Sequence, residues 1–86
     1  MKVVVNRCLG NYGLSPKAYD FLGFDWDGFG RKFKDYRNNE ELIKCVETLD
    51  KAADGENARL QVVEIPDDVG WMITEYNGVE IVEIWH

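Results

Sequence analysis

Cysteine, histidine and proline are scarce in this sequence of 86 residues, which contains two cysteines, one histidine and two prolines. Two cysteines are too few for a disulfide scaffold, and with one histidine they do not supply the four ligands of a zinc site. No apolar run approaches the roughly 20 residues that a membrane-spanning helix needs. The valines that follow Lys2 are too few for the apolar region of a signal peptide. We therefore expect a cytoplasmic protein with no membrane partner, no metal and no other cofactor.

Basic side chains are scarce in the second part of the chain. Residues 38–86 contain three basic and twelve acidic side chains, whereas residues 1–37 contain seven basic and four acidic ones. The formal net charge of the whole chain is −6. Because the acidic part repels phosphates, binding to double-stranded nucleic acid is disfavoured. The acidic part suits a partner protein with a basic surface, and the alternative explanation is simple solubility.

Local signals in the first half favour a strand followed by a helix. The β-branched run at residues 2–6 predicts a buried strand. Ser15 is a typical N-cap, Pro16 suits the first helical position, and Gly23 is a typical helix end. Polar and aromatic residues alternate over residues 32–36, which predicts a short additional strand.

The second half predicts a longer helix, a strand and a hairpin. Asn38 begins a capping box, and apolar side chains then recur at helical spacing up to Gly55. Residues 59–65 are typical of a strand, and Asn77-Gly78 between two β-rich segments favours a type I′ hairpin. This order predicts a single α/β (α+β) domain: a small two-layer sandwich with two helices on one face of a mixed four- to five-stranded sheet.

The turn between the first strand and the first helix is the predicted site for a small anion, such as a nucleotide signal. Gly10 and Gly13 let the backbone approach a ligand closely, and Ser15 begins a helix whose first N–H groups favour negative charge. Arg7 and Lys17 flank the turn and would add direct charge contacts. The alternative is an ordinary strand-to-helix turn without a ligand.

A second set of candidate residues would bind a partner protein. The carboxylates of Asp67, Asp68 and Glu80 are predicted to face a basic partner surface, with Glu80 on a solvated face of the hairpin. Trp26 and Phe29 form the alternative, an aromatic patch on the loop that follows the first helix.

Two further patterns allow a functional and a structural interpretation each. A basic cluster interleaved with aromatic rings would stack a nucleotide or a single strand, or would protect a strand edge from pairing. Its members are Arg31, Lys32, Phe33, Lys34, Tyr36 and Arg37. Cys8 follows a strand beside Arg7, a position that can lower a thiol pKa, but the one histidine is the last residue, His86. We therefore expect a structural thiol and no catalytic residues.

Two stretches of the chain resemble a family of small, functionally uncharacterised proteins of tailed phages and prophages. The first stretch is residues 3–8 with the glycine turn up to Ser15, and the second is residues 63–69. The second stretch is followed by Trp71, Ile73, Tyr76, Gly78 and Glu80. The resemblance implies a phage accessory protein in the host cell cytoplasm, without catalytic residues to assign.

The resemblance and the charge pattern together predict a non-catalytic protein that binds and antagonises a host macromolecule. A host defence system such as CRISPR is the candidate target. The alternative is a protein that binds or sequesters a small anionic ligand at the glycine turn.

Overall fold

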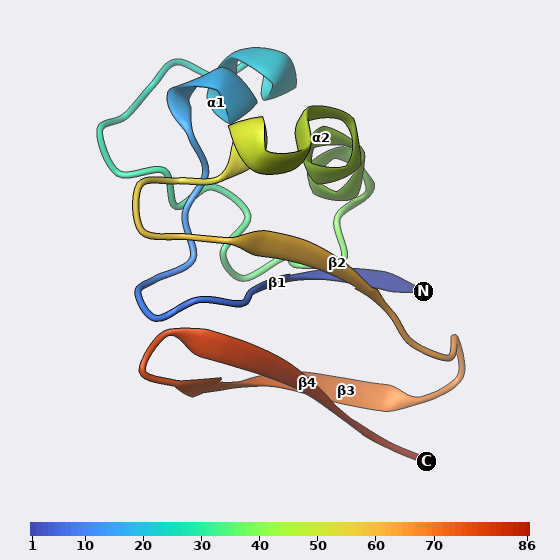
Figure 1. The fold of residues 1–86 in the computed structure, drawn as a ribbon. Helices are drawn as coiled ribbons and strands as arrows, with labels where there is room; N and C mark the ends of the chain where they lie inside the picture. The colour runs from blue at the N-terminus through green and yellow to red at the C-terminus, as the bar shows by residue number, and fades with distance from the viewer.

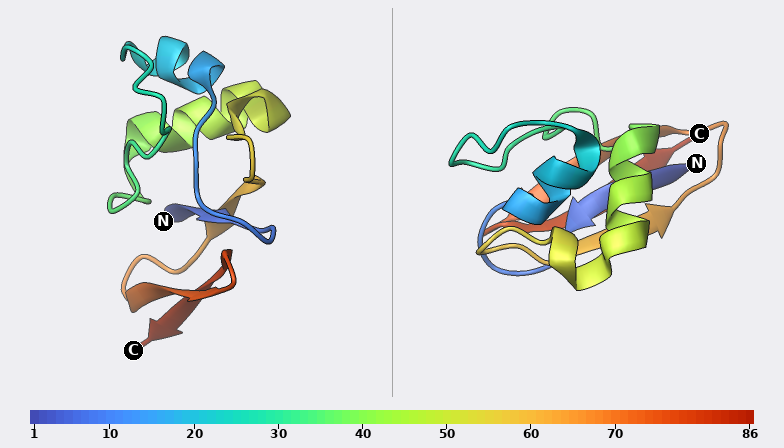
Figure 2. Two further views of the ribbon diagram at one scale, coloured as in Figure 1. Left: turned by 90° about the vertical axis from the view of Figure 1, so that its left-hand side faces the viewer. Right: turned by 90° about the horizontal axis from the view of Figure 1, so that it is seen from above.

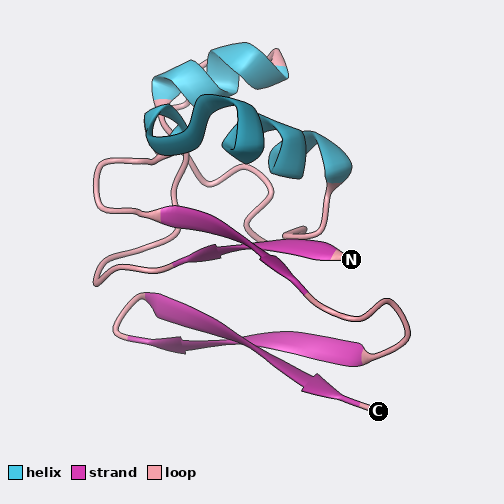
Figure 3. Cartoon of the chain, turned by 45° about the vertical axis from the view of Figure 1, so that its right-hand side comes forward, coloured by secondary structure: helices cyan, strands magenta, loops and turns pink.

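Helices and sheets form three layers in the computed structural model, which describes residues 1–86 (Figure 1). Two helices lie above one two-stranded sheet, and a second two-stranded sheet lies below it, as Figures 2 and 3 show from other directions. The elements are β1 (Lys2–Asn6), α1 (Pro16–Leu22), α2 (Glu40–Leu49), the 3₁₀ helix η1 (Asp50–Ala53), β2 (Leu60–Glu64), β3 (Gly70–Tyr76) and β4 (Val79–Trp85). Neither α-helix is long and apolar enough to cross a membrane.

The predicted α+β class is confirmed, but the single mixed sheet is wrong. β1 pairs antiparallel with β2, and β3 pairs antiparallel with β4, in two separate sheets. No third strand joins β1 because a turn covers its other edge, where the N–H of Val4 donates to the carbonyl of Arg37 at 2.8 Å. The strand predicted at residues 32–36 is also wrong. These residues form turns, with Phe33 at a φ of +62° and the N–H of Tyr36 bonded to the Phe33 carbonyl.

β1 lies between two hydrophobic cores, which explains its run of three fully buried valines. Because successive side chains of a strand point to opposite faces, Val4 faces the helices and Val3 and Val5 face the second sheet. The first core also contains side chains of both helices, Leu42 and Tyr19 among them. The second core fills the space between the sheets.

The helix ends agree with the sequence signals in part. Ser15 caps α1 by accepting from the N–H of Ala18, and Gly23 ends α1 in the left-handed conformation at a φ of +83°. The N-cap of α2 is Asn39 rather than Asn38, because the Asn39 side chain accepts from the N–H groups of Glu41 and Leu42. α2 ends at Leu49 and not near Gly55, since the chain then tightens into η1.

The type I′ hairpin is confirmed. Asn77 and Gly78 both have positive φ values, +55° and +94°, between the paired residues Tyr76 and Val79. A Cβ atom on Gly78 would lie 1.6 Å from the carbonyl oxygen of Gly10. The glycine therefore permits a close contact between the hairpin and the turn that follows β1.

Candidate functional site

The glycine turn after β1 packs closely against other loops. Gly10 has a φ of +141°, and a Cβ atom there would lie 2.2 Å from the carbonyl oxygen of Asn57. The carbonyl of Gly13 accepts from the N–H of Gly55 at 2.9 Å. Gly10 thus has a structural role, because only a glycine permits this contact with Asn57. At the second contact the glycine that permits the close approach is Gly55, whose Cβ would lie 2.8 Å from the carbonyl carbon of Gly13, whereas a Cβ on Gly13 itself would have no neighbour nearer than 3.9 Å.

Several hydrogen-bonding groups of the turn expected to hold an anion have partners within the protein. The N–H of Leu14 donates to the carbonyl of Gly30 at 2.7 Å, and the N–H of Ser15 donates to the carbonyl of Ala53 at 2.9 Å. The Ser15 hydroxyl bonds to Ala18 and to Ala52. These hydrogen bonds favour the structural interpretation of the turn, because two of its backbone donors and the cap hydroxyl are used within the protein.

Arg7 and Lys17, the two cations predicted to flank an anion, do not meet at one site. The Arg7 guanidinium reaches the carbonyl of Glu80 at 3.4 Å, and neither cation lines the pocket beside the turn. The Cys8 thiol donates to the carbonyl of Asn57 at 3.3 Å. Cys8 therefore helps to join the turn to the loop that precedes β2.

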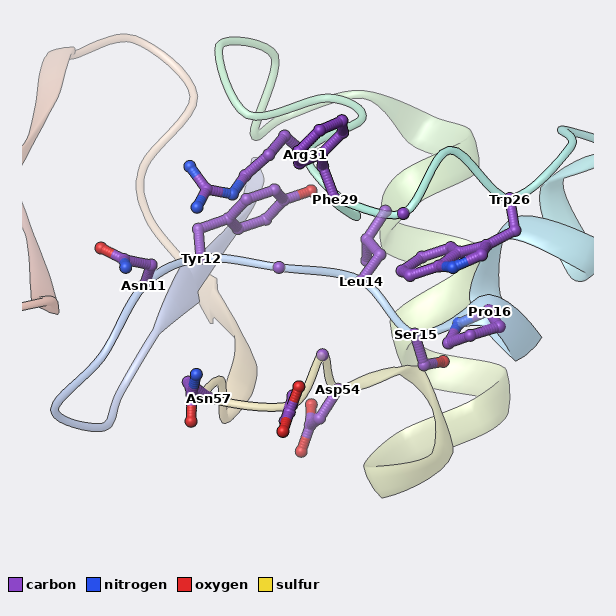
Figure 4. A pocket seen from close by; sticks show the side chains of 14 residues that line it. Asn11, Tyr12, Leu14, Ser15, Pro16, Trp26, Phe29, Arg31, Asp54 and Asn57 are labelled. Carbon is purple, nitrogen blue, oxygen red and sulfur yellow. The ribbon is translucent and has the colours of Figure 1, made fainter.

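Three loops surround an open pocket of about 470 Å³ (Figure 4). They are residues 11–16, residues 26–31 and residues 54–57. The pocket brings together members of both predicted sites, namely Gly13, Ser15, Trp26 and Phe29. It is therefore the one place where the candidate ligand turn and the candidate aromatic patch meet.

Asp27 fixes the conformation of the aromatic loop. Its carboxylate accepts from the N–H groups of Phe29 and Gly30 at 2.8 and 2.9 Å, and from the Tyr19 hydroxyl at 2.9 Å. The hydrogen bonds from Gly30 and Phe29 lower the pKa of the Asp27 carboxyl below its ordinary value. The loop is therefore ordered by a charged carboxylate at neutral pH.

Trp26 and Phe29 are held at the pocket with much of their surface exposed. The Trp26 ring lies edge-on to the Tyr19 ring, with the ring centroids 5.1 Å apart. Trp26 is 46% exposed and Phe29 is 77% exposed. Large aromatic side chains in an ordered loop with this exposure are typical of a contact surface.

Acidic side chains form the opposite wall of the pocket. In Figure 4, Asp54 and Asn57 lie across the pocket from Arg31 and Phe29, and Glu56 is a further lining residue. The Asp54 carboxylate accepts from the N–H of Leu60 at 2.9 Å, and burial raises the pKa of Asp54 above its ordinary value. None of the three charged residues that line the pocket, Arg31, Asp54 and Glu56, belongs to an ion pair. The pocket thus has two carboxylates and one guanidinium without ion-pair partners.

The prediction that Glu80 lies on a solvated face is wrong. Its carboxylate is buried and accepts two hydrogen bonds from the Arg37 guanidinium, at 2.6 and 2.8 Å. It also accepts from the N–H of Asn6 at 2.6 Å. Arg37 is likewise buried, with its guanidinium carbon 3.9 Å from the centroid of the Tyr12 ring. It therefore does not belong to an exposed basic cluster, contrary to the sequence prediction. This ion pair joins the hairpin to the rest of the fold.

The other predicted acidic residues lie far from the pocket. Asp67 pairs with the N-terminal ammonium group, which lowers the pKa of the Asp67 carboxyl, and Asp68 is its exposed neighbour. Both belong to the connection between β2 and β3, at the end of the molecule where the N-terminus lies (Figure 1). The pocket residues Tyr12, Asp54 and Glu56 were missed because only the fold brings their loops together, whereas Arg31 was named as a member of the basic cluster. The acidic Asp-Gly-Glu run at residues 54–56 was the one local feature of the sequence that pointed to this wall of the pocket.

The chemistry of the site and the comparisons give no catalytic assignment. His86 stands at the C-terminus, at the opposite end of the molecule from the turn that contains Cys8 (Figure 1). No three histidine, cysteine, aspartate or glutamate side chains are close enough together to hold a metal ion. Searches against protein-family models, curated proteins and solved structures found no match to this chain.

Proposed function

We propose that this chain is a non-catalytic binding protein whose pocket docks onto a basic, positively charged surface of a host protein. The observation that supports the proposal most directly is the pairing of two exposed aromatic rings, Trp26 and Phe29, with the unpaired carboxylates of Asp54 and Glu56. Arginine side chains suit such a surface, because the guanidinium stacks on aromatic rings and pairs with carboxylates.

The absence of a catalytic role is part of the proposal. A nucleophilic cysteine needs a base within hydrogen-bond reach. The neighbours of the Cys8 thiol are the Asn57 carbonyl and the Asn6 side-chain oxygen, neither of which is a general base. The second thiol, Cys45, is buried in the first core, and burial raises the pKa of Cys45 to about 11. Both thiols therefore fit structural roles.

The biological setting of the proposal is phage infection. Its support is the sequence resemblance to small phage and prophage proteins, over residues 3–15 and 63–80. In this setting the chain acts in the host cell cytoplasm and antagonises a host macromolecule, with a defence system such as CRISPR as the candidate target.

Site-specific crosslinking in host cells tests the proposal. A photoreactive phenylalanine analogue is placed at Phe29, and in a matched control at Tyr36, which is 67% exposed and outside the pocket. We expect one host protein to be crosslinked from position 29 and not from position 36, and we expect Trp26→Ala to abolish the adduct. Equal crosslinking from both positions, or none from position 29, contradicts the proposal.

A small anionic ligand is the competing candidate, and Arg31 is the observation in its favour. Its guanidinium lines the pocket without an ion-pair partner, close to rings on which a nucleotide base could stack. Calorimetric titration with nucleotides and cyclic nucleotides separates the two candidates. Nucleotide binding that Arg31→Ala removes would replace the host-protein proposal, and we expect no binding because Asp54 and Glu56 repel phosphate.

A further inference from the structure

The sheet formed by β3 and β4 has one buried face and one open face. Residues opposite each other in an antiparallel pair point to the same face, so the register divides the side chains into two sets. Trp71, Ile73 and Val82 belong to the inner set and pack against the second core. The outer set contains Met72, Thr74, Tyr76, Val79, Ile81, Glu83 and Trp85.

The outer face is largely apolar and is not covered by any element. Met72 is 50% exposed, Tyr76 62%, Ile81 37% and Trp85 53%. A Cβ atom on Gly70 would lie 2.4 Å from the Trp85 indole, so the ring lies directly over this glycine. The first sheet offers a contrast, because its own outer face is covered by the helices (Figure 3).

The charged side chains of β3 and β4 are all glutamates. No lysine or arginine follows Arg59, and of the six carboxylates in residues 60–86 only those of Glu80 and Asp67 have a cationic partner. Glu83 lies on the outer face itself and is exposed. A second copy of this chain would place two faces whose only charged side chain is Glu83 against each other, which like-charge repulsion disfavours. The charge pattern instead complements a partner with an apolar centre and basic edges.

The dimensions of the hairpin narrow the choice of partner. Strands of seven residues are about 23 Å long and lie about 4.8 Å apart, so the face is long and narrow. A single helix of about 15 residues matches its length.

We propose that the outer face of the β3–β4 hairpin binds an amphipathic helix whose apolar stripe is flanked by lysine or arginine. Met72, Ile81 and Trp85 contact the stripe, and Glu83 pairs with a flanking basic side chain. The inference rests on the proposed function, that the chain is a binding protein with a basic partner. It adds a surface that shares no residue with the pocket.

Designed peptides test this inference with the full chain. The first peptide is a helix of about 15 residues with a leucine stripe and lysine flanks, matched to the length of the hairpin. The second has the same stripe with glutamate flanks, and the third is a scrambled leucine–lysine sequence without a stripe. Calorimetry is carried out with wild type, with Met72→Lys and with the control Gln61→Lys, which makes the same charge change at an exposed position of β2.

We expect binding of the leucine–lysine helix only, weakened at least tenfold by Met72→Lys and less than threefold by Gln61→Lys. Equal binding of the scrambled peptide, no binding of any peptide, or equal effects of the two substitutions overturns the inference. A concentration-dependent dimer that Met72→Lys dissociates would also overturn it and assign the face to a second copy. Because Met72 does not line the pocket, the crosslink from position 29 of the otherwise unchanged chain tests the proposed function separately: its absence contradicts the proposed function whatever the peptide titrations show.

Discussion

The ion pair between Arg37 and Glu80 offers the sharpest test of how the hairpin is attached. Both side chains are buried, 5% and 8% exposed, and two hydrogen bonds join them. Glu80→Ala leaves the guanidinium without its counter-charge and the N–H of Asn6 without its acceptor. Breaking one side of a buried pair costs about 3–5 kcal/mol.

This loss is large for a domain of this size. A stability of about 0.05–0.15 kcal/mol per residue gives roughly 4–13 kcal/mol for the whole chain. In thermal melts, a loss of 3–5 kcal/mol corresponds to a fall in Tm of about 12–40 °C. We therefore expect Glu80→Ala to lose about 3–5 kcal/mol of the free energy of unfolding, as measured by urea denaturation followed by circular dichroism.

A double variant shows how much of the stability loss comes from leaving one buried charge without its partner. Arg37→Met with Glu80→Gln removes both charges and keeps an oxygen that can accept from the N–H of Asn6. Because replacing a whole buried pair costs far less than breaking it, we expect the double variant to be more stable than Glu80→Ala. A loss below about 1 kcal/mol in Glu80→Ala would refute the reasoning, because an uncompensated buried charge cannot cost so little.

Three further outcomes follow from the loops around the pocket. Gly30→Ala should lower Tm more than Gly28→Ala, because both have positive φ but only at Gly30 would a Cβ atom lie 2.3 Å from a backbone oxygen; equal losses would contradict the close contact. Cys8→Ala should keep the crosslink from position 29, and a folded variant that loses it would contradict a structural thiol. The pKa of the Asp27 carboxyl is lower in the folded chain than in the unfolded chain, so its charged form stabilises the fold at neutral pH, and this contribution is lost in acid as the carboxyl becomes protonated in the folded chain. The stability difference between wild type and Asp27→Asn should therefore shrink as pH falls below about 4. Urea midpoints at pH 7 and pH 3 measure this, and a difference that grows in acid would be inconsistent with it.

Local signals predicted the elements well because they act within a few residues. Ser15 and Gly23 delimit α1, and Asn77-Gly78 forms the hairpin turn, as the sequence indicates. Their effects depend on side-chain caps and on positive φ values, which neighbouring residues determine. The arrangement of the strands depends on which backbone edges meet. The sequence could not show that the segment ending at Arg37 covers the free edge of β1 and so prevents a single sheet.

The position of Glu80 was ambiguous because both faces of β4 are apolar. Alternation places Glu80 with Val82 and Ile84, while the other face contains Val79 and Ile81, so periodicity alone does not identify the inner face. The buried partner, Arg37, is 43 residues away in the sequence. The pocket was hidden for the same reason, since its walls come from three loops that only the folded chain brings together.

The two candidate surfaces are held in a fixed relation by the hairpin turn. The N–H of Gly10 donates to the carbonyl of Asn77, and the Asn6 side chain donates to the carbonyl of Gly78. The Arg37–Glu80 pair adds a second attachment between the hairpin and the first sheet. A partner that contacts both the pocket and the outer face therefore meets two surfaces that are already oriented. It does not have to order them on binding, and the second contact forms at a high effective concentration.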